Sequence, residues 1–175
     1  GLDGLDPVPY DLDTMDGHLA AVGDIALGKL DANEARAVEA QLRARYEGEI
    51  AFLDDTLADL WKDLDRQGWL DHTLVMVWTD HGEAFWDHGR WGHGGSLYET
   101  EVRVPLVLWA GPRVHERHPR IPRGPFEVPA AGVDVMPTLL ALAGAACPSC
   151  EGEDLLRLVE RGERSRPILL EQYMS

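Results

Sequence analysis

An Asp-His pair at positions 80 and 81 has the clearest capacity for chemistry in this chain. The pair follows an apolar run at positions 74–78 and precedes Gly82, which permits a sharp turn. Aspartate offers a hard oxygen ligand and histidine a borderline nitrogen ligand. Mixed ligation of this kind suits Zn, Mn or Fe, whereas ligation dominated by oxygen suits Ca or Mg. Asp80 and His81 therefore predict a divalent metal site, although two ligands are too few for tight binding.

The additional ligands would have to come from elsewhere, and the loop after the pair offers local candidates. These are Glu83, Asp87, His88 and His93. A capped turn without a metal is the alternative interpretation of an isolated Asp-His pair. The apolar run before the pair and the glycines and histidines after it favour the metal site. No residue of this stretch, or elsewhere in the chain, is an obvious nucleophile.

The elements around the pair predict an α/β fold. Apolar runs over residues 74–79 and 104–109 predict two strands, and the first is apolar enough to be covered on both faces. A long helix is expected to begin after Asp31, where Glu34 completes a capping box, and to end at Gly68. In open α/β sheets, ligands bind beyond the carboxyl ends of the strands, which is where the Asp-His pair lies.

Two further elements are expected towards the C-terminus. A helix is predicted to start near Asp134 or Pro137, since proline fits the first turn of a helix, and to run to Gly144. The apolar run at residues 168–170 predicts a last strand. The order helix, strand, loop, strand, helix, strand is typical of an α/β domain.

Length and charge limit the classes of protein. A chain of 175 residues predicts a single domain over residues 1–175, of which residues 1–30 form a loop-rich lead-in. The net charge of -15 argues against a nucleic-acid partner, which requires a basic footprint. No apolar run is long enough to span a membrane. No signal peptide begins at Gly1, and cytoplasm and export both stay open as the location, as does the oligomeric state.

The two cysteines, Cys147 and Cys150, are separated by a Pro-Ser pair. They allow three interpretations: a redox pair, half of a zinc site, or a turn that closes a small disulfide. A zinc site would need two more ligands, and a redox motif should open a helix beside a strand. We therefore favour the turn.

Four short stretches of this sequence resemble the C-terminal part of the sulfatase family's catalytic domain, in the alkaline phosphatase superfamily. They are residues 79–83, 87–89, 92–99 and 103–106. Residues 46–55 and 70–74 look like the family's long helix and the turn into its metal-bearing strand, and residues 134–140 look like its following helix. The resemblance implies a mixed or parallel sheet flanked by helices, like that of alkaline phosphatase, and incomplete in this chain.

The resemblance also implies roles for individual residues. Asp80 and His81 would be two ligands of a divalent metal: calcium, as in relatives with Asp-Asn at this place, or Mn or Zn, as in phosphonate monoester hydrolases with Asp-His. His93 lies near the position where relatives place a Lys or His that contacts the sulfate or phosphate oxygens. A cation there would stabilise charge that develops on those oxygens. Arg103 is equally suited to a structural ion pair and to a functional role.

The resemblance implies a metal-dependent sulfuric ester hydrolase that acts on a small-molecule or saccharide sulfate or phosphate ester. Its nucleophile would be a formylglycine made in a Cys/Ser-x-Pro-x-Arg motif, and the 175 residues contain no such motif. We therefore expect a fragment whose nucleophile and first metal ligands lie upstream, and which is inactive alone. The segment at residues 7–10 also lacks the family's usual histidine, for which His18 is a weak substitute.

Two other functions remain open from the sequence. Within the same superfamily, the parent protein would be a phosphodiesterase, a phosphonate monoester hydrolase or a phosphoglycerol transferase, and an unmodified Thr or Ser nucleophile would favour these. From a different class, the chain would be a non-catalytic binding module that kept the fold and lost the site.

Overall fold

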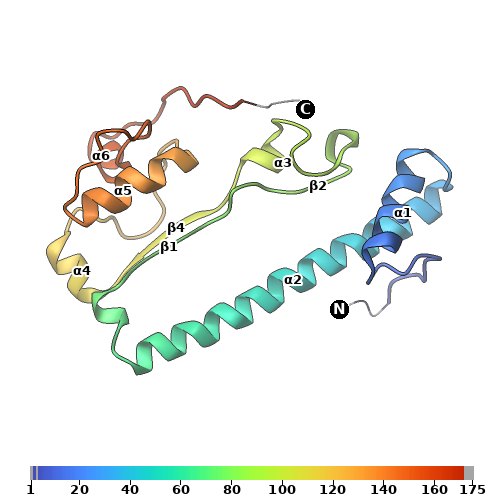
Figure 1. The fold of residues 1–175 in the computed structure, drawn as a ribbon, viewed down its shortest axis with the longest axis horizontal. Helices are drawn as coiled ribbons and strands as arrows, with labels where there is room; N and C mark the ends of the chain where they lie inside the picture. Colours follow the sequence, from blue (N-terminus) through green and yellow to red (C-terminus); the bar gives the residue numbers. More distant parts are fainter. Residues whose placement is uncertain (1, 3, 172–175) are drawn as a thin grey trace. The chain divides into compact units, whose positions relative to one another are not determined.

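The computed structural model describes residue 2 and residues 4–171. Within these residues the chain forms two compact units, Gly1–Leu64 with Glu83–His93, and Asp65–Gly82 with Gly94–Ser175. The described residues form helices and two short antiparallel strand pairs, and this mixture of helices and strands confirms the α/β class (Figure 1). The expectation of one domain over residues 1–175 stays a prediction, and it includes residues 1, 3 and 172–175, which lie outside the described residues.

The long helix of the first unit begins and ends where the sequence predicts. Helix α2 spans Ala32–Arg66, and only its last two residues belong to the second unit. The carboxylate of Asp31 accepts the backbone N–H groups of Asn33 and Glu34, and the Glu34 carboxylate accepts the N–H of Asp31 at 2.8 Å. This is the reciprocal capping box. The helix runs without interruption through Gly48.

The lead-in over residues 1–30 contains a helix that the sequence analysis did not anticipate. Helix α1 spans Met15–Ala26, and the hydroxyl of its N-cap residue, Thr14, accepts the backbone N–H of Gly17 at 3.1 Å. Ala21 of α1 is fully buried against Leu12 and against Val38 of α2. The loop-rich interpretation gave weight to the prolines, glycines and aspartates and overlooked this threonine cap.

An aromatic cluster anchors the hairpin of the first unit to α2. Strands β2 (Ala84–Phe85) and β3 (Trp91–Gly92) pair antiparallel, with the 3-10 turn η2 (Asp87–Gly89) between them. The rings of Phe85 and Trp91 meet edge to face with centroids 5.0 Å apart, and Tyr46 of α2 meets Phe85 at 4.9 Å. The Arg43 guanidinium lies 4.7 Å from the centre of the Phe85 ring. These contacts fix the loop that carries Glu83 and His93 within this unit.

The second unit is built on an antiparallel ribbon (Figure 1). After the turn η1 (Leu70–His72), strand β1 (Leu74–Trp78) pairs with β4 (Leu106–Ala110), and the register places Leu74 opposite Ala110. Both predicted strands are confirmed. The face with Leu74 and Ala110 packs on the core, whereas Val77 and Val107 on the other face are 44% and 55% exposed. The expectation that the first strand is covered on both faces is therefore wrong for the described residues.

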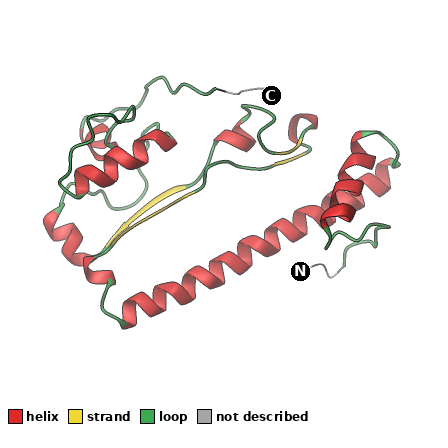
Figure 2. Ribbon diagram, in the orientation of Figure 1, coloured by secondary structure: helices red, strands yellow, loops and turns green. Residues whose placement is uncertain are grey.

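Short helices complete the second unit. They are α3 (Glu99–Val102), α4 (Pro112–Arg117), η3 (Gly132–Asp134), α5 (Val135–Leu142) and α6 (Leu155–Glu160). The helix predicted from Asp134 or Pro137 is α5. Leu142 of α5 and Leu156 of α6 are buried in one core with Ala110 and Ile121. Long loops join α4 to η3 and follow α6 (Figure 2).

Two sequence predictions near the C-terminus have opposite outcomes. Cys147 and Cys150 form a disulfide, which confirms the closed turn between α5 and α6. The strand predicted at residues 168–170 is absent, and this part of the described chain has no regular structure. Leu169 is 82% exposed there. An apolar run alone does not make a strand, because it also needs a neighbouring strand to satisfy its backbone groups. Across the described part of the chain, no helix is both long and apolar enough to cross a membrane.

A pair of leucines tests the assignment of the second core. Leu156 is fully buried, and truncation to alanine removes buried methyl groups and leaves a cavity. We expect Leu156→Ala to lower the free energy of unfolding by about 2–5 kcal/mol, measured by urea denaturation. Leu169→Ala, at an exposed position, is the control and should change it by about 0.5 kcal/mol or less. Equal effects of the two changes would contradict this core.

Candidate active site

Asp80 and His81 lie directly after the C-terminal end of β1, in the second unit. The Asp80 Oδ1 atom is 3.7 Å from the His81 Nε2 atom. The side chain of Asp80 is 85% exposed and that of His81 is 41% exposed. The hydroxyl of Thr79 lies 3.3 Å from Asp80 Oδ1 and 3.1 Å from the His81 carbonyl oxygen, which braces the turn. The pair is thus open to solvent and its two donor atoms face each other.

The local backbone sets the tautomer of His81. The His81 Nδ1 atom is 2.8 Å from the carbonyl oxygen of Gly82. A carbonyl oxygen only accepts hydrogen bonds, so Nδ1 carries the proton in this contact. In the neutral ring the lone pair is then on Nε2, the atom that faces Asp80. Metal-bound histidines in proteins almost always donate their other ring N–H to a carbonyl or carboxylate in this way.

The geometry of the pair fits one divalent ion. Two ligands that are each about 2.0–2.4 Å from a common ion stand roughly 3–4 Å apart. The separation of 3.7 Å between Asp80 Oδ1 and His81 Nε2 lies within that range. Across the described residues, no group of three or more His, Cys, Asp or Glu side chains is arranged to hold a metal. In the part of the chain that the structure describes, Asp80 and His81 have the spacing that two ligands of one ion require, without a third such side chain beside them.

Hydrogen bonds keep the Asp80 carboxylate ionised. The pKa of Asp80 is lowered, first by a hydrogen bond from its own backbone N–H and then by the positive charge that the His81 ring carries when it is protonated. The His81 backbone N–H also donates to Asp80 Oδ1 at 3.1 Å. Each of these interactions favours the charged form of the carboxyl group. Asp80 is therefore an anionic oxygen donor at neutral pH, as a ligand of a hard cation must be.

Gly82 is packed against α3, and this contact holds the turn that follows Asp80 and His81 in place. The backbone N–H of Gly82 donates to the Glu101 carbonyl oxygen at 2.7 Å. A Cβ atom at Gly82 would lie 2.1 Å from the carbonyl oxygen of Thr100. The sequence analysis attributed this glycine to a sharp turn, but Gly82 is not among the glycines with positive φ. The close approach of α3 is the reason for glycine here.

Glu101 is a buried carboxylate that the sequence analysis missed. Its side chain, only 4% exposed, accepts the backbone N–H groups of Gly95 and Ser96 and the hydroxyl of Ser96. The Ser96 hydrogen bond is the largest cause of the lowered pKa of Glu101. The Tyr98-Glu-Thr-Glu-Val sequence gave no signal for it, because Glu99 and Glu101 are equivalent until the packing of the helix is known.

His93 lies at the end of the hairpin segment of the first unit and pairs with Glu83. The distance from His93 Nδ1 to Glu83 Oε2 is 3.1 Å, and their side chains are 50% and 20% exposed. The carboxylate fixes the orientation of the imidazole ring. Between the two residues, Trp86 and His88 have positive φ values of 63° and 55°, a conformation that side chains rarely adopt. The segment between Glu83 and His93 therefore carries local strain.

The other sequence candidates have structural partners. Arg103 pairs with Glu99 at 3.6 Å, one turn away on α3, and both side chains are about four-fifths exposed. This favours the ion-pair interpretation of Arg103. The ring of His18 packs against Trp91 with centroids 5.7 Å apart.

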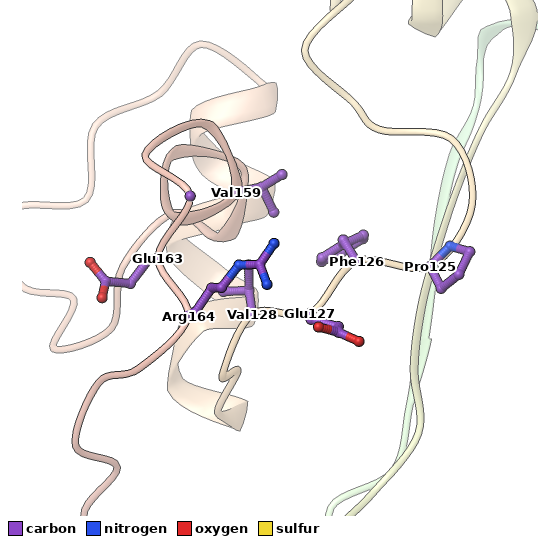
Figure 3. A pocket seen from close by; sticks show the side chains of 8 residues that line it. Pro125, Phe126, Glu127, Val128, Val159, Glu163 and Arg164 are labelled. Atoms are coloured by element: carbon purple, nitrogen blue, oxygen red, sulfur yellow. The ribbon is translucent and has the colours of Figure 1, made fainter.

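A cavity of about 400 Å³ in the second unit lies between the 125–128 segment and α6 with the residues that follow it. Phe126 and Val159 lie on its two sides (Figure 3). None of the predicted site residues lines it. The cavity is therefore separate from the Asp80–His81 pair and adds no ligand to it.

Comparison with known proteins assigns the family. The pattern described as Sulfatase matches residues 14–145. Most of the chain lies within this match, including Asp80, His81 and His93. The chain belongs to the sulfatase family.

Three relatives illustrate the extent of the similarity. A choline-sulfatase of Rhizobium meliloti (strain 1021) is 34% identical over 133 residues, which are 74% of this chain and 24% of the relative. The multifunctional alkaline phosphatase superfamily protein PehA of Trinickia caryophylli is 38% identical over 138 residues, 78% of this chain and 25% of the relative. Arylsulfatase K of Mus musculus is 32% identical over 135 residues, 75% and 22% of the two chains. The chain spans about a quarter of the length of these relatives.

The buried carboxylate predicts a pH dependence of the 95–96 loop. Because the pKa of Glu101 is lower in the folded chain, its hydrogen bonds stabilise the fold above the ordinary glutamate pKa. That stabilisation is lost as the pH falls through the folded value. We expect the protection factors of the Gly95 and Ser96 amides, measured by hydrogen exchange and corrected for the intrinsic rate, to fall as the pH is lowered through this range, and Glu101→Gln to remove this pH dependence. Protection factors that are low and do not change with pH in the parent would contradict the contact.

Proposed function

We propose that this chain is part of a metal-dependent sulfuric ester hydrolase, in which Asp80 and His81 supply two ligands of a divalent metal. The observation that carries the proposal is the 3.7 Å separation of Oδ1 and Nε2, together with the Nδ1–H donation from His81 to Gly82. Membership of the sulfatase family supports it. A divalent metal bound there would stabilise negative charge on a sulfate or phosphate ester. Mn or Zn suits the mixed donor pair, and Ca is the alternative.

His93 is proposed as the group that contacts the non-bridging oxygens of the ester. Charged imidazole carries an N–H on both ring nitrogens. With Nδ1–H donated to Glu83, the Nε2–H is the donor for a substrate oxygen. Such a donor stabilises negative charge that grows on the oxygens as the ester bond breaks. Glu83 acts through His93, because it fixes the ring and compensates its charge.

The nucleophile of the proposed reaction is a formylglycine outside these residues. The 175 residues contain no Cys/Ser-x-Pro-x-Arg motif from which that group would form. The proposed substrate is a small-molecule or saccharide sulfate ester. The names of the relatives, among them a choline-sulfatase and an arylsulfatase, support sulfate esters as the class.

Phosphoester or phosphonate ester hydrolysis is the second candidate. It is favoured by the similarity to the multifunctional alkaline phosphatase superfamily protein PehA and by the Asp-His pair itself, whose nitrogen ligand suits a transition metal. The two candidates differ in the nucleophile. A Cys or Ser in the formylglycine motif favours the sulfatase, and an unmodified Thr or Ser favours phosphoryl transfer. A non-catalytic binding module is the third, weaker candidate, because the anionic Asp80 and the tautomer of His81 are both arranged for ligation.

The metal-ligand proposal is tested by titration of the purified chain with Mn²⁺. We expect weak binding, measured by calorimetry, because Asp80 and His81 supply only two ligands. In Asp80→Ala we expect the affinity to fall at least tenfold. Asp71→Ala, which removes another exposed acid of the same unit, is the control and should leave the affinity unchanged. Binding that is as strong in Asp80→Ala as in the parent would overturn the assignment.

A second prediction concerns activity. The purified 175-residue chain should hydrolyse neither 4-nitrophenyl sulfate nor 4-nitrophenyl phosphate above the buffer rate with Mn²⁺, Zn²⁺ or Ca²⁺ present. The reason is the absence of the nucleophile motif from its sequence. Metal-dependent release of 4-nitrophenol that Asp80→Ala abolishes would show that these residues hold a nucleophile of their own.

A further inference from the structure

Glu101 binds two backbone segments of the second unit: its carboxylate binds residues 95–96, and its main-chain carbonyl oxygen binds Gly82. Its carboxylate accepts the N–H groups of Gly95 and Ser96, at 3.2 and 3.3 Å, and the Ser96 hydroxyl. Its own carbonyl oxygen accepts the N–H of Gly82 at 2.7 Å. The Glu101 residue is 4% exposed, and the three donor groups belong to partly buried residues. The position of α3 against Gly82 therefore depends on a satisfied, buried carboxylate.

Gly82 passes this constraint to His81. The N–H of Gly82 is held by Glu101, and its carbonyl oxygen accepts Nδ1–H from the His81 ring. The close approach to Thr100 leaves the Gly82 α-carbon little room to move. The Gly82 carbonyl group, which accepts the His81 Nδ1–H, thus belongs to a residue whose position is fixed by α3.

We propose that Glu101 is a positioning residue for His81: through Gly82 it holds the imidazole in the orientation and tautomer that present Nε2 as a metal ligand. This inference rests on the proposed function, in which His81 is a ligand. The Glu101 carboxylate accepts hydrogen bonds from Gly95 and Ser96, and its proposed effect on His81 runs through the backbone.

The change Glu101→Gln removes the negative charge of the side chain and keeps its size. Its amide has the same size as the carboxylate but one acceptor oxygen and one NH₂ donor. With its amide oxygen at the Oε1 place, the NH₂ group would face the N–H groups of Gly95 and Ser96; with the oxygen at the Oε2 place, the Ser96 hydroxyl would have to turn and accept from the NH₂ group. In either orientation the charge-assisted hydrogen bonds between the Ser96 loop and α3 are lost, and we expect the contact of α3 with Gly82 to loosen. Glu99→Gln is the matched control, since Glu99 lies on the same helix and forms an exposed ion pair with Arg103.

The test reads the ring of His81 directly. Two-dimensional ¹⁵N–¹H correlation of the metal-free chain, at a pH where the ring is neutral, distinguishes the two tautomers. We expect Nδ1–H in the parent and in Glu99→Gln, and a mixture of tautomers in Glu101→Gln. Mn²⁺ affinity should fall about tenfold in Glu101→Gln, the scale on which groups behind a metal ligand act. Ser96→Ala, which removes one donor and keeps the carboxylate, should fall between the parent and Glu101→Gln, and it is the variant of choice if Glu101→Gln does not fold.

The outcomes separate this inference from the proposal it rests on. The parent tautomer in a folded Glu101→Gln or Ser96→Ala chain, with unchanged Mn²⁺ affinity, would overturn the positioning role. A changed tautomer in Glu101→Gln, together with Mn²⁺ binding that Asp80→Ala leaves unchanged, would overturn the proposed metal site. It would still support the positioning of the ring by Glu101. A changed tautomer with weaker binding supports both.

Discussion

The contact between Gly82 and α3 is the constraint on which the candidate site depends. A hydrogen bond of 2.7 Å joins the Gly82 N–H to the Glu101 carbonyl oxygen, and any larger residue at position 82 would overlap the Thr100 carbonyl oxygen. Gly82 immediately follows the ligand pair. The end of β1 is therefore tied to a helix that comes nearly twenty residues later, just before β4. The β1–β4 ribbon and α3 together hold the Asp80 and His81 side chains in a fixed geometry.

This arrangement explains how an exposed pair of side chains keeps a defined geometry. Asp80 and His81 are both partly or largely accessible to solvent, so burial does not hold them. Hydrogen bonds do so instead: Thr79 and backbone N–H groups for the carboxylate, and the Gly82 carbonyl oxygen for the ring. Ligands that are oriented before the metal arrives lose less conformational freedom on binding. A pair of this kind is suited to complete a site whose other ligands come from elsewhere.

Local signals predicted much of the fold. The capping box at Asp31 and Glu34, the αL glycine at Gly68 and the apolar runs before Asp80 and Pro112 each correspond to a nearby physical interaction, and the structure bears them out. Helix α1 was missed because one threonine cap is a weak signal beside several turn-forming residues. The strand at residues 168–170 was wrong because pairing depends on a neighbour that no local pattern reveals.

In the candidate site, too, the sequence revealed features that are local and missed those that depend on tertiary contacts. Asp80 and His81 were predicted from their residue types and position, and the role of His93 from the resemblance to the sulfatase family; their assignment as site residues stays a proposal. The role of Glu101 was not found, since a buried glutamate and an exposed one two positions away look alike in sequence. The reason for Gly82 was also mistaken, because close approach by a distant helix is a tertiary effect, whereas a sharp turn is a local one.

The most direct test of the central claim is pulsed electron paramagnetic resonance of Mn²⁺ bound to the purified chain. Ligation by His81 predicts a hyperfine coupling from one imidazole ¹⁴N nucleus, present in the parent and absent in His81→Gln. A spectrum without imidazole coupling in the parent, or one whose coupling persists in His81→Gln, would contradict the assignment of the Asp80–His81 pair as metal ligands.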